Sequence, residues 1–272
     1  MNPLDAWDAL LQTVPFEPLR PQLAKLDAGR FPALDELNAQ LTQAPIAVQS
    51  GRQLSFVEQA AGRLAFEQQY EPRCYLSGEV QTRQHNWHDF FNALVWLSFP
   101  QAKASINARH YRALTQAAAG ASHSQRGAVR DTNTLLDESG VIVAYADDEL
   151  AGLLRNFEWR ALFFERRERV KSHMGFYLFG HGLYEKALQP YPGMTGQGLL
   201  LPVEPDFFSW AMPQQLAHLD LRLADYLDLP GNCQSTRELS PVPLLGVPGW
   251  TDENKSASYY DDRRYFRPGR RA

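Results

Sequence analysis

Residues 86–100 read NWHDFFNALVWLSFP and carry the clearest helical signal in the chain. The side-chain oxygen of Asn86 can cap the first free amides of a helix, and Asp89 stands three residues later, as in a capping box. Phe90 to Phe99 supplies an apolar run that ends at Pro100. The sequence therefore predicts a buried helix between Asn86 and Pro100.

Hydrophobic periodicity predicts further helices on both sides of this segment. Apolar residues recur there at three- and four-residue spacing, which is typical of one buried helix face. The predicted helices lie in an N-terminal region, residues 1–44, and at residues 102–119, 147–155, 158–169, 181–188 and 213–227.

Strand patterns are shorter. Met174 to Phe179 and Leu199 to Val203 each predict one strand. Apolar runs flank Ser50-Gly51, and others flank Asp137 to Gly140; both arrangements are typical of a tight β-hairpin. The sequence therefore predicts a helix-rich α+β fold with short β-hairpins.

The C-terminal part of the chain, residues 229–272, has prolines and glycines that interrupt every helical or strand period. Its Leu244 and Trp250 belong to a stretch too apolar for a free linker. We therefore expect an extended segment that wraps the core and ends in a basic tail. No repeat or domain boundary stands out elsewhere, so the sequence predicts a single domain over residues 1–272.

Composition narrows the class of protein. The chain has 272 residues, of which 44% are hydrophobic and 21% charged, and this excludes a disordered or collagen-like protein. The formal net charge of −4 argues against a protein that mainly coats nucleic acid. The dense basic run from Arg263 to Arg271 is either a solvated terminus or an arm that contacts nucleic acid weakly.

Cys74 and Cys233 are too few and too far apart for a disulfide framework or a thiolate zinc site. The N-terminus, residues 1–15, lacks the basic and apolar pattern of a secretion signal. The longest nearly apolar run, Phe90 to Phe99, is about half as long as a membrane span. We therefore expect a cytoplasmic protein without a membrane partner.

His85, His88 and Asp89 form the densest group of potential metal ligands. Residues three and four apart share one helix face, so these side chains could bind one cation if the helix included His85. If the asparagine cap forms, His85 lies outside the helix and Asp89 serves the first amides instead. With further ligands from other helices, the sequence predicts a zinc or manganese site made by His88, Asp89, His110 and His181.

A second group of polar residues lies in GHGLYE, residues 180–185. His181 and Glu185 are four residues apart at the start of a predicted helix and would face one side. They could act as a base with its orienting carboxylate, or as two metal ligands. The alternative is a capping histidine and a surface glutamate. We take His181 and Glu185 as the predicted catalytic residues, with Glu185 as base or orienter.

Other candidates are more ambiguous. Asp137 and Glu138 suit general acid–base chemistry, but they lie in a predicted turn, where aspartate is favoured because it bonds to nearby backbone amides. No Gly-x-Ser-x-Gly nucleophile motif and no Walker loop occur in the sequence. The arginines that could neutralise a phosphate or a carboxylate are Arg83, Arg109, Arg130 and Arg160.

The pair His88-Asp89 is similar to the dyad of the all-helical, metal-dependent His-Asp phosphohydrolases. The chain departs from that family in two respects. The family's first histidine sits on a separate upstream helix, whereas only three residues separate His85 from His88. The predicted hairpins also do not fit an all-helical fold.

Five longer strings together resemble one bacterial family, DUF3025. They are NWHDFFNALVW (86–96), GHGLYEK (180–186), PLLGVPGW (243–250), YYDD (259–262) and RYFRP (264–268). The resemblance spans nearly the whole chain. It implies a bacterial, cytosolic protein that folds as one unit, and it implies no particular chemistry.

Two functions therefore stay open at the level of the sequence. The first is a metal-assisted hydrolase that acts on a phosphate-containing substrate, with metal-bound water as the nucleophile. The second is a non-catalytic binding or assembly protein, in which the His/Asp clusters cap helices and tie the C-terminal segment to the core.

Overall fold

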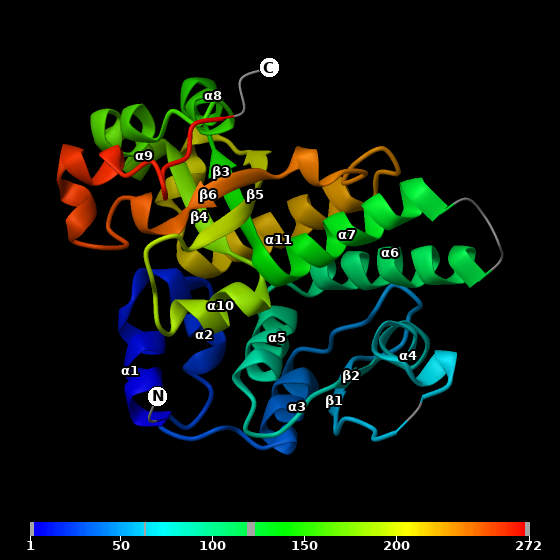
Figure 1. Cartoon of the computed structure of the whole chain (residues 1–272). Coiled ribbons are helices and arrows are strands. Elements are labelled where there is room, and N and C mark those ends of the chain that lie inside the picture. The colour runs from blue at the N-terminus through cyan, green and yellow to red at the C-terminus, as the bar shows by residue number, and fades with distance from the viewer. Residues whose placement is uncertain (1–2, 63, 119–122, 270–272) are drawn as a thin grey trace.

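The computed structural model describes residues 3–62, 64–118 and 123–269 (Figure 1). Its α-helices are α1 Pro3–Gln12, α2 Arg20–Leu23, α3 Leu34–Gln43, α4 Tyr70–Ser77, α5 Trp87–Ser98, α6 Pro100–Ala118, α7 His123–Ser139, α8 Asp148–Arg155, α9 Arg167–His173, α10 His181–Ala187 and α11 Met212–Asp228. Its strands are β1 Ser55–Val57, β2 Glu79–Gln81, β3 Gly140–Tyr145, β4 Met174–Leu178, β5 Thr195–Pro202 and β6 Ser240–Pro243. The fold is α+β, as predicted.

The larger sheet has the strand order β4-β3-β5-β6. Its centre is β3, which pairs antiparallel with β4 and parallel with β5. Every residue of β3 is buried, which explains why its sequence, GVIVAY, is an unbroken run of apolar and small residues. The smaller sheet consists of β1 and β2, which pair in parallel.

The predicted central helix is confirmed as α5. The Asn86 side chain accepts a hydrogen bond from the Asp89 amide at 3.0 Å, so the asparagine cap forms. His85 has a positive φ of 56° and lies before the helix. Most of α5 is buried, and α10 packs against it below the larger sheet in the view of Figure 1.

The hairpin predicted around residues 137–140 is wrong. There α7 continues to Ser139, and β3 begins directly at Gly140. The buried face of α7 includes the polar residues Thr132 and Asn133 beside Leu136, so the helix lacks a clear apolar stripe in the sequence. The hairpin predicted at Ser50-Gly51 is present as a narrow turn with one antiparallel bridge, from Ala47 to Gln53.

Two glycines bring the end of α7 next to the start of α10. The amides of Phe179 and Gly180 both donate to the carbonyl oxygen of Gly140, at 3.0 and 2.9 Å. A Cβ atom at Gly180 would lie only 2.4 Å from the Gly140 nitrogen, so the two backbones approach more closely than larger residues allow. This crossing places the last turn of α7 beside His181.

The C-terminal segment packs onto the body of the molecule, as its apolar residues predict. Its strand β6 forms the edge of the larger sheet against β5. Leu244, Val247 and Phe266 are buried, and the Tyr265 hydroxyl donates to the Met194 carbonyl oxygen at 2.8 Å. Within the described part of the chain, no helix has the length and apolar character needed to cross a membrane.

Candidate metal centre

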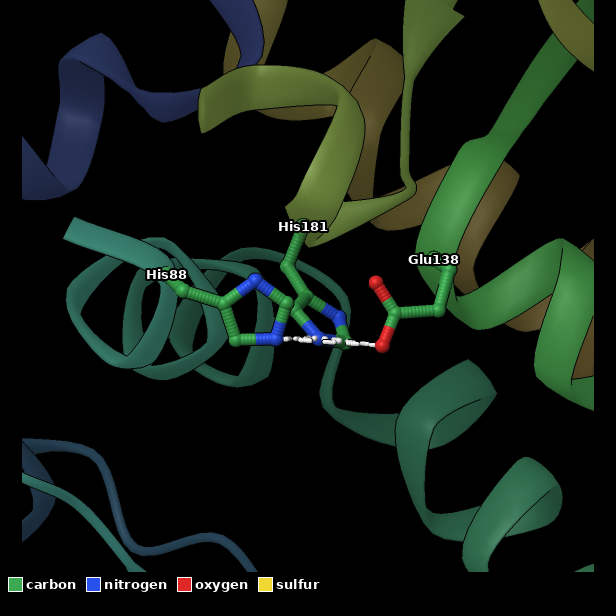
Figure 2. A group of neighbouring side chains, drawn as sticks. All are labelled: His88, Glu138 and His181. Atoms are coloured by element: carbon green, nitrogen blue, oxygen red, sulfur yellow. Dashed lines mark hydrogen bonds and ion pairs between the residues drawn. The ribbon is translucent and has the colours of Figure 1, made fainter. Parts of the chain in front are cut away.

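Three side chains from distant parts of the sequence converge at the junction of α5, α7 and α10 (Figure 2). His88 lies in the first turn of α5, Glu138 in the last turn of α7, and His181 is the first residue of α10. The two Nε2 atoms of His88 and His181 are 3.0 Å apart. Glu138 Oε1 lies 3.4 Å from His181 Nε2 and 3.7 Å from His88 Nε2.

These separations suit a single cation. Tetrahedral zinc with bonds of about 2.0–2.1 Å holds its ligand atoms roughly 3.3 Å from one another. The three separations in the structure lie on both sides of that value. Two imidazoles and one carboxylate are also ligand types that zinc accepts. The group can therefore bind a divalent cation without a large rearrangement.

The second ring nitrogen of each histidine faces a carboxylate. His88 Nδ1 lies 3.2 Å from Glu185 Oε2, and His181 Nδ1 lies 3.7 Å from Asp137 Oδ2. His181 Nδ1 is buried and has no hydrogen-bond partner among the described residues, and the Asp137 carboxylate lies just beyond hydrogen-bond distance of it. Metal-binding histidines usually have such a carboxylate, which orients the ring and makes the other nitrogen a better ligand.

Beneath His181, Asp137 belongs to a buried polar network. Lys103 Nζ donates to Asp137 Oδ1 at 2.5 Å and to Asn92 Oδ1 at 2.9 Å. Asn92 in turn donates to the Tyr70 hydroxyl at 2.6 Å. Burial by itself raises the pKa of Asp137, but the nearby charges of Lys103 and His181 outweigh it and lower that pKa. Asp137 is therefore an ionised carboxylate although it is buried.

Glu138 is also held in its ionised form. The hydrogen bond with His181 lowers the pKa of Glu138 and outweighs the opposing effect of burial, and the charges of His181 and His88 lower it further. A carboxylate must lose its proton before it can bind a metal. Glu138 therefore has the ionised form that a metal ligand needs.

The three side chains line a pocket with a volume of about 310 Å³. On α7, Arg130, Thr134 and Glu138 follow one another at four-residue spacing and so share one helix face. The remaining lining residues are Gln59, Tyr70, Glu71, Gln81, Arg83, Asp89, Asn92, His110, Leu114, Asp137 and His181, with His88 on the wall formed by α5.

The structure brings together His88, His181 and Glu185 of the predicted site. Asp89 lines the same pocket, but Arg83 bonds to both of its carboxylate oxygens at 2.9 Å. Burial raises the pKa of Asp89, and the hydrogen bonds from Arg83 reverse that effect and lower it. Asp89 therefore has a structural partner already, and we leave it out of the ligand set proposed below.

His110 also lines the pocket, but it does not belong to the group of ligand atoms that lie within 4.8 Å of one another. Glu138 completes the group in place of the predicted ligands Asp89 and His110. Its sequence pattern indicates a candidate for acid–base chemistry and not a metal ligand, because residues 137–140 are typical of a turn. The signal that could have found it is the continuation of α7 at helical spacing through buried Leu136 to Ser139.

The four candidate arginines have different surroundings. Arg83 pairs with Asp89. Arg109 donates to three backbone carbonyl oxygens near the end of α11, and Arg160 pairs with acidic residues at the surface. Arg130 lines the pocket and forms no ion pair with another residue in the described ranges. Of the four arginines, Arg130 is thus the one available to pair with an anionic group of a bound ligand.

A substitution at Gly182 tests the geometry of the group. A Cβ atom there would lie 2.5 Å from Glu138 Oε2. The carboxylate can rotate away, but the Glu138 carbonyl oxygen, 3.1 Å from the added Cβ, must also shift slightly. We therefore expect Gly182→Ala to lower stability modestly and to weaken zinc binding about 10-fold or more, because the Glu138 carboxylate is displaced. Zinc titration and thermal unfolding of the metal-free protein measure the two effects.

Gly152→Ala is the matched control for this substitution. It also lies in a helix, and nothing stands within 4 Å of its Cβ position. Its zinc affinity should equal that of the unsubstituted protein. Unchanged zinc affinity in Gly182→Ala would show that Glu138 is not a ligand.

Comparison with known proteins identifies a family. No curated protein and no solved structure matches the chain. One family model does match, over residues 54–270, and its description is "Protein of unknown function (DUF3025)". The matched region contains His88, Glu138 and His181. Because the match covers most of the sequence, this chain belongs to the DUF3025 family.

Proposed function

We propose that this protein is a metal-dependent hydrolase in which His88, Glu138 and His181 bind one divalent cation. The observation that carries the proposal is the convergence of three ligand atoms at the wall of a pocket, from residues that are 43 or more positions apart in the sequence. Three protein ligands leave a coordination position for water or substrate, which is typical of catalytic zinc. Manganese also accepts carboxylate and imidazole ligands, and it is the alternative metal.

In such a centre the nucleophile would be a water molecule bound to the metal. A divalent cation lowers the pKa of a bound water to about 7, so that hydroxide is present at neutral pH. Glu185 and Asp137 would orient His88 and His181 through their Nδ1 atoms, at the separations of 3.2 and 3.7 Å. This supports the role of orienter, rather than base, for Glu185.

The face of α7 that carries Glu138 favours a phosphate-containing substrate. Arg130 is an arginine without an ion pair among the described residues, and the Thr134 hydroxyl lies between it and Glu138 on the same face. Eight residues of helix separate Arg130 from Glu138, which is about 12 Å along the axis. A guanidinium matches the geometry of phosphate oxygens, so Arg130 would bind a phosphate group.

Metal analysis tests the proposal most directly. Protein prepared without chelator or added histidine tag should contain close to one equivalent of zinc or manganese. The double variant His88→Ala, His181→Ala should contain almost none. His173→Ala is the control, because the His173 side chain bonds only to the neighbouring Ser172 hydroxyl in the described structure. It should retain the full metal content.

The same preparations decide between the two functions. A metal present at 100 times its dissociation constant stabilises the folded state by about 2.7 kcal/mol, so thermal unfolding should respond to zinc or manganese. A metal-free protein whose unfolding is indifferent to both metals would contradict the proposal. In that case the polar groups would be structural, as in a non-catalytic binding protein.

A further inference from the structure

His110 is a buried polar side chain that the proposed metal centre does not use. It is 4% exposed, lines the pocket and forms no hydrogen bond with another residue of the described ranges. Buried imidazoles normally satisfy at least one ring nitrogen within the protein. An unpartnered imidazole at the wall of a pocket therefore points to a contact with a bound ligand.

Glu71 lies near His110 on the same side of the pocket. One turn before His110 on α6, the Asn107 amide donates to Glu71 Oε2 at 2.6 Å and to the Glu71 carbonyl oxygen at 3.0 Å. These two bonds fix the position of the Glu71 side chain relative to α6. Burial raises the pKa of Glu71, and among the neighbouring charges His110 opposes this rise most.

Other charged groups surround this pair. Asp137 faces it from α7, and its charge interacts with both Glu71 and His110. Lys103 lies two turns earlier on α6 and is paired with Asp137. Arg130 is a further charged residue of α7 that lines the pocket. Asp220 of α11 also packs against α6, but it accepts hydrogen bonds from the first amides of that helix, at the end away from His110. Glu71 and Asp137 are thus the acidic groups that face His110, and Lys103 is already paired with Asp137.

We propose that His110 is a catalytic residue that donates a proton to the leaving oxygen of a phosphate ester. Glu71 is a positioning residue whose carboxyl group lies next to the imidazole. This inference rests on the proposed function, because it requires the metal centre to supply the nucleophile. It assigns His110 a role different from the metal ligand that its residue type suggests.

Hydroxide, which a metal held by His88, Glu138 and His181 would supply, forms a bond to phosphorus, and the bond between phosphorus and the leaving oxygen breaks. The electron pair of that bond goes to the leaving oxygen, which takes the proton of the His110 imidazolium. Phosphate and an alcohol are released, and His110 regains a proton from solvent. No oxidant or reductant takes part.

The dependence on the leaving group tests this role. The alcohol released from benzyl phosphate needs a proton as it departs, whereas p-nitrophenolate is stable without one. We expect His110→Gln in the metal-loaded protein to lower kcat/KM for benzyl phosphate by about 10²- to 10⁴-fold. The loss for p-nitrophenyl phosphate should be smaller than about 10-fold. His173→Gln serves as the control and should leave both rates unchanged.

A pH profile separates a proton donor from a structural residue. A required acid produces a decrease in kcat/KM at high pH, and His110→Gln should remove this decrease for benzyl phosphate. Glu71→Gln should instead shift the decrease to lower pH, because the imidazolium loses a neighbouring negative charge. Glutamine at position 71 can still accept the hydrogen bond from Asn107. This second variant therefore tests the inference even if His110→Gln does not fold.

The outcomes distinguish the inference from the function on which it rests. His110 is not the acid, and the hydrolase proposal stands, in either of two cases. In the first, His110→Gln keeps its metal but kcat/KM falls equally for both esters. In the second, Glu71→Gln leaves the pH profile unchanged. Loss of metal from His110→Gln would make His110 a ligand and would also overturn the inference. If the metal-loaded parent protein hydrolyses neither ester, both proposals fail.

Discussion

Replacing Lys103 with methionine is expected to lower the free energy of unfolding by about 3–5 kcal/mol, because the change leaves an uncompensated charge in the core. Lys103 is 2% exposed and its partner Asp137 is 9% exposed. Methionine fills the space of the lysine stem but cannot donate to Asp137 or to Asn92. Chemical unfolding of the metal-free protein measures the loss without a contribution from metal binding.

The chain offers a matched control for this substitution. Lys255 and Asp252 have the same nitrogen–oxygen separation, 2.5 Å, but both side chains are largely exposed. Solvent screens such a pair, so Lys255→Met should leave the free energy of unfolding nearly unchanged. Equal effects of the two substitutions would contradict the view that burial makes the Lys103 pair important.

Removal of both members of the buried pair separates charge from packing. In Lys103→Met, Asp137→Leu no unpaired charge is left, so much of the lost stability should return. The same double variant removes the carboxylate next to His181 Nδ1. The double variant should therefore bind metal more weakly than the unsubstituted protein although its stability recovers. That result would show that Asp137 contributes to metal binding as well as to stability.

Local sequence was sufficient to predict the elements that carry the two histidines. The cap at Asn86 and the apolar run after it depend on neighbouring residues, and so α5 and the place of His88 in its first turn could be predicted. His181 follows a strand and a glycine, and its helix was predicted for the same reason. The two rings share their Nε2 contact although 93 residues separate them.

Glu138 could not be predicted in the same way. Its position depends on the contact between Gly140 and Gly180, which are 40 residues apart and whose backbones meet only in the folded sheet. The composition of residues 137–140 also favours a turn, and only the continuation of α7 makes them the end of a helix. For Asp89 the residue type predicted a metal ligand, but in the fold its carboxylate is paired with Arg83, six residues earlier.

The proposed centre also predicts that substitution of Glu138 lowers metal content and hydrolysis more than substitution of Glu185 does. Glu138→Gln removes a ligand, so we expect the equivalent of bound metal to be lost and kcat/KM for p-nitrophenyl phosphate to fall by about 10³-fold, since metal catalysis supplies several kcal/mol. Added metal should restore little, because the amide cannot replace the negative charge of the carboxylate. Metal content and hydrolysis are measured on the same samples.

Glu185→Gln changes a carboxylate that lies 3.2 Å from the outer nitrogen of His88 and belongs to a side chain that is 48% exposed. Such partners usually contribute about 10- to 100-fold in metal affinity, so hydrolysis should fall at limiting metal and return at saturating metal. The distinction is physical: a ligand supplies a bond to the cation, whereas an orienting carboxylate only makes that bond more favourable. If Glu185→Gln were the variant that saturating metal cannot restore, Glu185 would be the base, and the roles of the two glutamates would have to be exchanged.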